Sequence, residues 1–102
     1  MGDGGLQFLR VGKALKQDAH HAFPDIVDNF AGDAQRFKIP YRIAGGEIAG
    51  QSDLFQLEGA LQGKSGRMSS GIFEWIVHDG QVTHRRFIEG GQITGFPNQR
   101  VR

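Results

Sequence analysis

The chain contains no cysteine, which excludes disulfide bonds and thiolate metal sites and leaves packing alone to hold the fold together. It also lacks any apolar run near the roughly 20 residues that a membrane-spanning helix requires. The N-terminus does not show the basic and then apolar layout of a secretory signal. The sequence therefore predicts a domain that folds without covalent cross-links and has no membrane span.

Excess charge is also missing, because 12 Lys and Arg residues against 11 Asp and Glu residues give a formal net charge of +1. The molecule as a whole is thus no strong electrostatic attractor of nucleic acid. Its basic residues lie mostly late in the chain, with nine of them against six acidic residues over positions 36–102. With 102 residues, eight Phe, one Trp and one Tyr, the chain has enough for one compact core, so we expect residues 1–102 to form a single domain.

Two kinds of hydrophobic spacing divide the chain. In the N-terminal third, apolar residues recur at helical intervals over 6–15 and again over 24–34, which predicts two helices. Further along, alternating side chains predict strands, and Pro40 within the first of them indicates an edge position. The expected strands cover residues 36–43, 53–61, 71–78, 81–88 and 92–95, with a loop over 62–70. The predicted fold class is α+β, with N-terminal helices packed on a four- to five-stranded antiparallel sheet.

The segment Gly71–Ile88 is typical of two strands joined by a tight turn at Asp79-Gly80. If His78 and Gln81 flank that turn, a regular register follows for the whole hairpin. The expected cross-strand pairs are Ile76 with Thr83, Trp75 with His84, Glu74 with Arg85, and Phe73 with Arg86. The hairpin then carries an imidazole, guanidinium groups, a hydroxyl and a carboxylate, which together can bind a phosphodiester and move protons on it.

His84 is the leading candidate for proton transfer, because a histidine can take and return a proton near neutral pH. The alternative is ordinary cross-strand packing of His84 on Trp75. His21 is the second candidate, since it lies just before Pro24 at the expected start of a helix, where an anion binds readily. Its alternative is helix-start packing or a solvated loop.

Arg85 and Arg86 can hold phosphate oxygens and stabilise the charge that develops at phosphorus. The alternatives are a cross-strand ion pair between Arg85 and Glu74, and a solvated Arg86 side chain. Glu74 can act as a base or orient Arg85, whereas Thr83 can bond a phosphate or simply favour the strand. No metal or cofactor is expected, because the chain has no His-Glu-x-x-His segment and its four histidines are spread along it.

Five separated segments form a recognisable set: His21–Asn29, Leu54–Gly59, Gly71–Val77, Val82–Ile88 and Ile93–Gln99. In this order they resemble the C-terminal toxin domains of large bacterial surface proteins. The carriers of such domains are filamentous-haemagglutinin-like, contact-dependent growth inhibition and Rhs-type polymorphic toxins. The resemblance covers residues 20–99, and the common order of its segments makes it more specific than any one of them.

The resemblance implies a metal-independent ribonuclease toxin with the barnase-like fold of colicin tRNases and bacterial mRNA-interferase toxins. Such toxins usually cleave tRNA and are neutralised by a cognate immunity protein. The chain would then be the C-terminal part of a secreted or cell-surface carrier, delivered into the cytoplasm of a target cell and monomeric when free. Carried over by motif, the site residues are His21, Glu74, Thr83, His84, Arg85 and Arg86.

The resulting hypothesis is RNA cleavage by transesterification, in which the substrate 2′-hydroxyl attacks the adjacent phosphate. One histidine, His84 or His21, takes the hydroxyl proton, and a second acid protonates the leaving 5′-oxygen. Arg85 or Arg86 stabilises the charge at phosphorus. The alternative is a non-catalytic protein-binding module of the immunity or adaptor type, which uses a surface of Trp75, His84 and Arg86.

Overall fold

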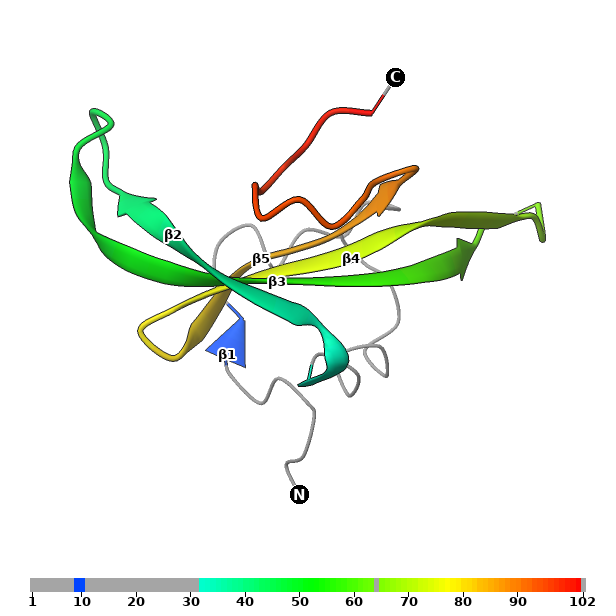
Figure 1. Ribbon diagram of the computed structural model, residues 1–102, viewed down its shortest axis with the longest axis horizontal. Coiled ribbons are helices and arrows are strands. Elements are labelled where there is room, and N and C mark those ends of the chain that lie inside the picture. Colours follow the sequence, from blue (N-terminus) through cyan, green and yellow to red (C-terminus); the bar gives the residue numbers. More distant parts are fainter. Residues whose placement is uncertain (1–8, 11–31, 64, 102) are drawn as a thin grey trace.

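The computed structural model describes residues 9–10, 32–63 and 65–101, whose strands form a single twisted sheet (Figure 1). The strands are β1 (Leu9–Arg10), β2 (Gln35–Arg42), β3 (Ile48–Gln62), β4 (Met68–His78) and β5 (Gln81–Glu89). Their order in the sheet is β1-β5-β4-β3-β2, with β1 parallel to β5 and every other pair antiparallel. The described sheet is thus an antiparallel meander from β2 to β5, with the short β1 added at one edge.

The predicted α+β fold class is wrong for the described part of the chain, which is nearly all antiparallel sheet and contains no α-helix. The helices expected over 6–15 and 24–34 fall largely outside the described residues. Within the first of them, Leu9–Arg10 is strand β1, whose backbone pairs with Gln81 and Val82 of β5. Helical spacing is a weak preference, and pairing with an open sheet edge overrides it here. The barnase-like arrangement of helices packed on a sheet is therefore not retained.

The strand predictions from residue 35 onward are largely confirmed. In the described sheet β2 is an edge strand, as Pro40 indicated. β3 and β4 are longer than expected, because their pairing continues to Gln62 and Met68 and takes in much of the expected 62–70 loop. Residues 92–95 form no strand, since the backbone N–H groups of Gln92 and Thr94 bond side chains instead.

One face of the sheet, called the aromatic face below, carries the hydrophobic core. Its buried cluster consists of Phe73, Trp75, Val77, Val82 and Phe87, with Ala34, Phe55, Leu57 and Leu61 packed against it. Phe73 and Phe87 are cross-strand partners whose ring centroids lie 5.0 Å apart. Burying one large apolar side chain contributes about 1.5–3 kcal/mol. This cluster therefore supplies much of the free energy that holds β3, β4 and β5 together.

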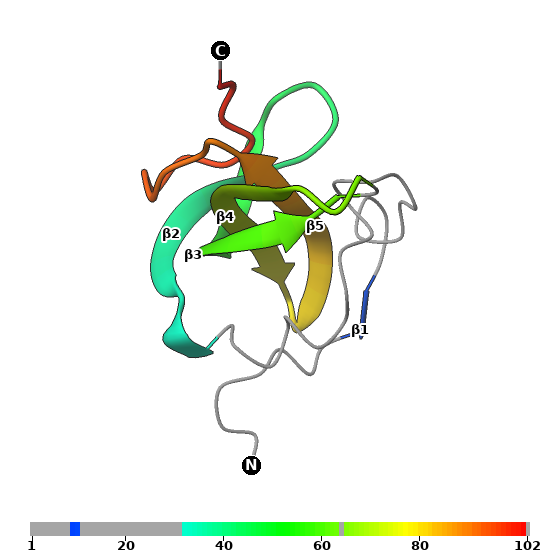
Figure 2. The ribbon, with the colours of Figure 1, turned by 90° about the vertical axis from the view of Figure 1, so that its right-hand side faces the viewer.

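The opposite face, called the polar face below, is covered by residues 90–101, which we call the C-terminal segment. Figure 2 shows this segment, orange to red, on one side of the curved sheet. Gly95 allows a close approach, since it has φ +79° and a Cβ there would come within 3.1 Å of the Phe37 ring. Both faces of the central strands are buried, so Ile72–Trp75 are buried in succession, where a sheet open on one side would alternate.

Candidate active site

The hairpin singled out by the sequence is present, and its turn has the expected conformation. Asp79 and Gly80 have positive φ angles of 49° and 76°, and His78 pairs with Gln81. Positive φ at both central residues defines a type I′ turn, which glycine tolerates freely and aspartate more readily than most residues. The turn therefore fixes where the register of the hairpin begins.

Beyond the turn, a β-bulge at Thr83 shifts the register. Val82 pairs with Val77, whereas the next pair joins His84 to Ile76, so Thr83 is the extra residue of β5. The Thr83 hydroxyl donates to the carbonyl oxygen of Ile76 over 3.4 Å. The four expected cross-strand pairs are therefore wrong by one residue. The observed pairs are Ile76 with His84, Trp75 with Arg85, Glu74 with Arg86, and Phe73 with Phe87.

The bulge brings His84 to the face that carries Glu74. Side chains of a strand alternate between faces, so the expected register would have put His84 on the face of Trp75, away from the carboxylate. In the structure, His84 Nε2 lies 2.9 Å from Glu74 Oε1. Both residues are buried, with relative exposures of 3% for His84 and 0% for Glu74. A buried carboxylate–imidazole pair is thus the chemical centre of the polar face.

Three donors meet at the Glu74 carboxylate. Besides His84, the backbone N–H of Asn98 donates to Oε1 over 3.0 Å, and Gln56 Nε2 donates to Oε2 over 2.8 Å. Burial by itself raises the pKa of Glu74, but the hydrogen bonds from these donors outweigh it and hold that pKa below its usual value. Glu74 is therefore ionised at neutral pH and accepts only, so His84 Nε2 carries the hydrogen of their shared bond.

Gln56 ties this carboxylate to the C-terminal segment. Its side-chain oxygen accepts from the backbone N–H groups of Thr94 and Gly95 over 2.9 and 3.1 Å. Its Nε2 also donates to the carbonyl oxygen of Phe96 over 3.1 Å, so every donor and acceptor of the buried amide is used. Gln56 was not predicted as a site residue, because in the sequence it is only a polar position in an alternating strand. Asn98 was not predicted either, because its bond to Glu74 comes from the backbone and leaves no side-chain signal.

The two arginines of the hairpin lie on opposite faces. Arg86 pairs with Glu74 across the strands, and its Nη1 donates to Asn98 Oδ1 over 3.2 Å. Its Nε is enclosed and has no hydrogen-bond partner among the residues that the structure describes. Arg85 instead pairs with Trp75 and is 1% exposed on the aromatic face. Arg85 therefore lies on the face opposite to Glu74 and His84, and its expected pairing with Glu74 is wrong because of the bulge.

Of the residues proposed from the sequence, the structure brings together Glu74, His84 and Arg86. Thr83 adjoins them in the chain, but its hydroxyl bonds the backbone, and its structural role is to form the bulge. His21 lies outside the described residues. The pair on the polar face therefore includes one of the two histidines proposed for proton transfer.

Neither this pair nor the surface of the binding-module alternative is open to solvent. Trp75 is 0% exposed on the aromatic face, while His84 is buried on the polar face. A surface that combines Trp75, His84 and Arg86 is therefore not formed. On the polar face, Phe96 and Asn98 of the C-terminal segment bond the buried groups directly and close the site.

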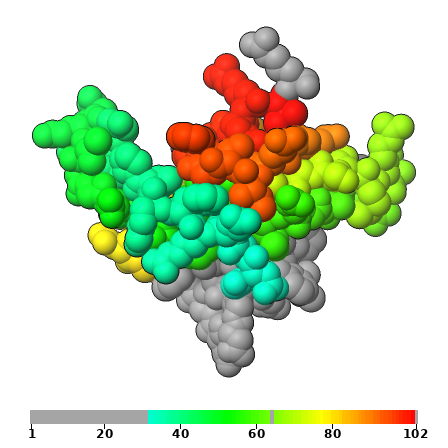
Figure 3. Space-filling view, in the orientation of Figure 1, coloured from blue at the N-terminus to red at the C-terminus, as the bar shows by residue number. Residues whose placement is uncertain are grey.

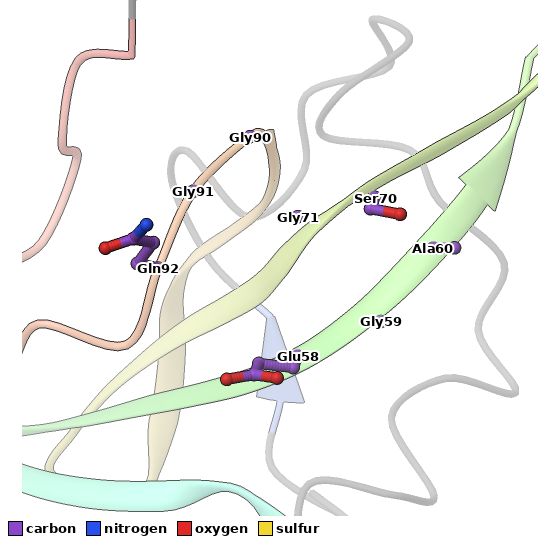
Figure 4. Close-up of a pocket in the computed structure, with 8 residues that line it drawn as sticks. All are labelled: Glu58, Gly59, Ala60, Ser70, Gly71, Gly90, Gly91 and Gln92. Carbon is purple, nitrogen blue, oxygen red and sulfur yellow. The ribbon is translucent and has the colours of Figure 1, made fainter.

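A hollow at the end of the sheet away from the hairpin turn carries little chemistry (Figure 4). The residues that line it are Glu58, Gly59, Ala60, Ser70, Gly71, Gly90, Gly91 and Gln92. Half of them are glycines, and Glu58 is the one ionisable side chain among these lining residues. Because the lining has no imidazole or guanidinium, the hollow does not extend the site.

A groove of about 590 Å³ lies between β2 and the C-terminal segment, next to two neighbours of His84. Figure 3 shows this segment, orange to red, lying against the cyan residues of β2. The groove lining includes Ile76, the cross-strand partner of His84, and Thr83, its neighbour in the chain. The rest of the lining is Lys38, Ile39, Pro40, Tyr41, Arg42, Ser52, Gly95, Phe96 and Pro97.

Comparisons of the chain with protein-family models, with curated proteins and with solved structures found no match. Among the residues that the structure describes, no helix has the length and hydropathy needed to cross a membrane.

Proposed function

We propose that this chain is a ribonuclease domain in which Glu74 and His84 form the proton-transfer pair. The observation that carries the proposal is the 2.9 Å contact between His84 Nε2 and Glu74 Oε1 in a buried, hydrogen-bonded setting. A carboxylate that accepts from one imidazole nitrogen fixes the orientation and tautomer of the ring. It also stabilises the imidazolium that forms when the other nitrogen takes a proton.

In this mechanism His84 Nδ1 takes the proton of the substrate 2′-hydroxyl, because Nε2 is committed to Glu74. The 2′-oxygen attacks the adjacent phosphorus, the bond to the 5′-oxygen breaks, and a 2′,3′-cyclic phosphate forms. Arg86, the cross-strand partner of Glu74, supplies the cation that stabilises negative charge at phosphorus. A second acid, for which His21 is the candidate from the sequence, protonates the leaving 5′-oxygen.

Substrate reaches His84 only when part of the C-terminal segment moves, because the residue is 3% exposed. Two side chains hold the segment to the sheet: Gln56 binds Thr94, Gly95 and Phe96, and Glu74 binds Asn98. A segment attached by a few hydrogen bonds opens at a lower free energy than a sheet held by a ladder and a packed core. RNA binding therefore competes with the bond between Asn98 and Glu74, while the bonds of Gln56 keep Phe96 in place.

The biological setting of the proposal follows from the motif resemblance. We infer a toxin that cleaves RNA, with tRNA as the substrate, in the cytoplasm of a competing bacterial cell. A secreted or cell-surface carrier delivers it, and a cognate immunity protein neutralises it. Two of the motif segments, Gly71–Val77 and Val82–Ile88, supply Glu74 and His84, which supports reading them as one functional unit.

The test is incubation of the purified chain with tRNA in EDTA, followed by analysis of the new ends. The proposal requires cleavage that EDTA does not abolish and 2′,3′-cyclic phosphate at the products. Expression inside bacterial cells separates the ribonuclease from the binding module, since only a toxin stops growth in the absence of its immunity protein. Cleavage that disappears in EDTA would overturn the metal-independent mechanism.

A further inference from the structure

The groove beside the pair is flanked by an aromatic side chain that the C-terminal segment presents to solvent. Phe96 lines the groove and is 73% exposed. Its backbone is fixed on both sides, since its N–H donates to Thr94 Oγ1 over 3.1 Å and its carbonyl oxygen accepts from Gln56 over 3.1 Å. An exposed ring on an anchored backbone is available to stack on a ligand.

A second aromatic side chain reaches the groove from β2. Tyr41 lines it and stacks on His78, with ring centroids 3.5 Å apart and an interplanar angle of 9°. The His78 ring is itself held, because its Nδ1 lies 3.1 Å from Ser52 Oγ and 3.2 Å from the carbonyl oxygen of Gln51. Tyr41 is therefore held in a stacked arrangement beside the groove.

The edge strand next to the groove is cationic. β2 carries Arg36, Lys38 and Arg42, and Asp53 of β3 bonds the first two at 3.0 and 2.7 Å. Arg42 donates to the carbonyl oxygen of Gly46, a neutral group that does not compensate the charge of the guanidinium. Lys38 and Arg42 line the groove, whereas Arg36 lies over the Phe55 ring of the aromatic face, so Lys38 and Arg42 are the two cations that suit a phosphate backbone there.

We propose that this groove is a nucleobase subsite, filled by the base of a nucleotide that flanks the cleaved phosphate. The inference rests on the ribonuclease function proposed above and adds how the substrate is held. Tyr41 and Phe96 supply aromatic faces for the base, and Lys38 and Arg42 attract the backbone. Two residues of the groove lining adjoin His84, since Ile76 is its cross-strand partner and Thr83 precedes it in the chain, so a base bound there lies one residue away from the proton-transfer pair.

Binding can be measured apart from chemistry with a fluorescent 2′-O-methyl RNA, which lacks the attacking hydroxyl. Tyr41→Ala and Phe96→Ala should each weaken binding by about tenfold, the order expected when one stacked base loses its ring. Tyr41→Phe keeps the ring and should bind like the wild type. Ile43→Ala, at an exposed apolar residue just beyond β2, is the matched control and should leave the dissociation constant unchanged.

A series of oligonucleotides with one abasic position each identifies the base that occupies the subsite. One position should weaken wild-type binding by about tenfold and have no further effect on Tyr41→Ala. The subsite is overturned if every abasic position weakens Tyr41→Ala as much as the wild type, or if the wild type binds no RNA. Tyr41-dependent binding by a chain that cuts no RNA would keep the subsite and refute the ribonuclease. Cleavage with binding indifferent to Tyr41→Ala would refute the subsite alone.

Discussion

His84 Nε2 lies 2.9 Å from Glu74 Oε1 because a single extra residue in β5 turns the imidazole to the face that holds the carboxylate. That residue is Thr83, and if it paired with Ile76 in a regular ladder, His84 would lie opposite Trp75. Bulges often re-aim a side chain next to an active site. The bulge is therefore the structural device on which the proposed chemistry depends.

Deleting Thr83 should remove the bulge and leave His84 beside Glu74. His84 then follows Val82 directly and still pairs with Ile76, so the imidazole stays on the face of the carboxylate. We expect the free energy of unfolding, measured by urea denaturation, to fall by clearly less than the loss of about 3–5 kcal/mol that follows when a buried pair loses one member. His84→Ala removes that member and should show the larger loss. Equal losses in the two variants would contradict the observed register.

Glu74 should make the fold sensitive to acid. Burial raises its pKa and hydrogen bonds lower it, and the net result lies below the ordinary value of 4.5. The unfolded chain then binds the proton at a higher pH than the native one. The stability that Glu74 contributes is complete above about pH 4.5 and is lost as the pH falls through the folded pKa.

The measurement is the free energy of unfolding of the wild type and of Glu74→Gln at a series of pH values. Glu74→Gln should give a shallower loss of stability below about pH 4.5. Asp53 is the comparator, because its hydrogen bond to Lys38 heads the interactions that lower its pKa. Asp53→Asn should also make the loss of stability at low pH shallower, independently of Glu74→Gln. A Glu74→Gln profile parallel to that of the wild type would show that the carboxylate is not held ionised.

Gln56→Leu should loosen the C-terminal segment. The substitution removes the partner of the Thr94 and Gly95 N–H groups and of the Phe96 carbonyl oxygen, and each of these part-buried hydrogen bonds contributes about 0.5–1.5 kcal/mol. Limited proteolysis within residues 92–99 should become faster while the sheet remains folded. Gln62→Leu is the control, since Gln62 bonds the exposed turn at Gly66 and its loss should change stability by about 0.5 kcal/mol or less. A segment equally resistant in both variants would mean that Gln56 does not anchor it.

Substitution of Arg86 should mainly lower activity, whereas substitution of Arg85 should mainly lower stability. Arg86→Ala should slow RNA cleavage by about 10²–10³-fold, the range seen when a donor to developing charge is removed. Arg85→Ala should mainly lower the free energy of unfolding, because the side chain is buried in the aromatic face. The measurement is the single-turnover cleavage rate of each variant at a temperature where both are folded. A folded Arg85→Ala as slow as Arg86→Ala would place Arg85 in the chemistry.

The turn and the strands could be predicted from the sequence because each leaves a local signal. Asp79-Gly80 supplies both positive φ angles of the turn, and the alternation over residues 53–61 gives β3. The bulge leaves no such signal, because Thr83 is an ordinary strand residue. Its consequence is still large, since a shift of one residue exchanges the two faces of the rest of β5. Arg85 was therefore assigned to the site although it lies in the core.

The role of the C-terminal segment could not be predicted from the sequence for a different reason. Ile93–Gln99 was identified as one of the resembling segments, but its structural role could not be derived from side-chain types. The segment docks through the backbone N–H groups of Thr94, Gly95 and Asn98. Every residue except proline carries such a group, so the residue types do not reveal this role. Its partner Gln56 is a buried amide at a position where only polarity was visible.

We claim that Glu74 and His84 act as one proton-transfer unit, and a double-variant cycle on tRNA cleavage tests this. His84→Ala should slow the reaction by about 10²–10⁴-fold, and Glu74→Gln by a comparable factor. Residues that act as a unit are not additive, so the double variant should be no slower than the slower single variant. Circular dichroism must show each variant folded, and Glu89→Gln, at an exposed residue of β5, should cleave at the wild-type rate. Full activity of His84→Ala, or losses that multiply in the double variant, would contradict the claim.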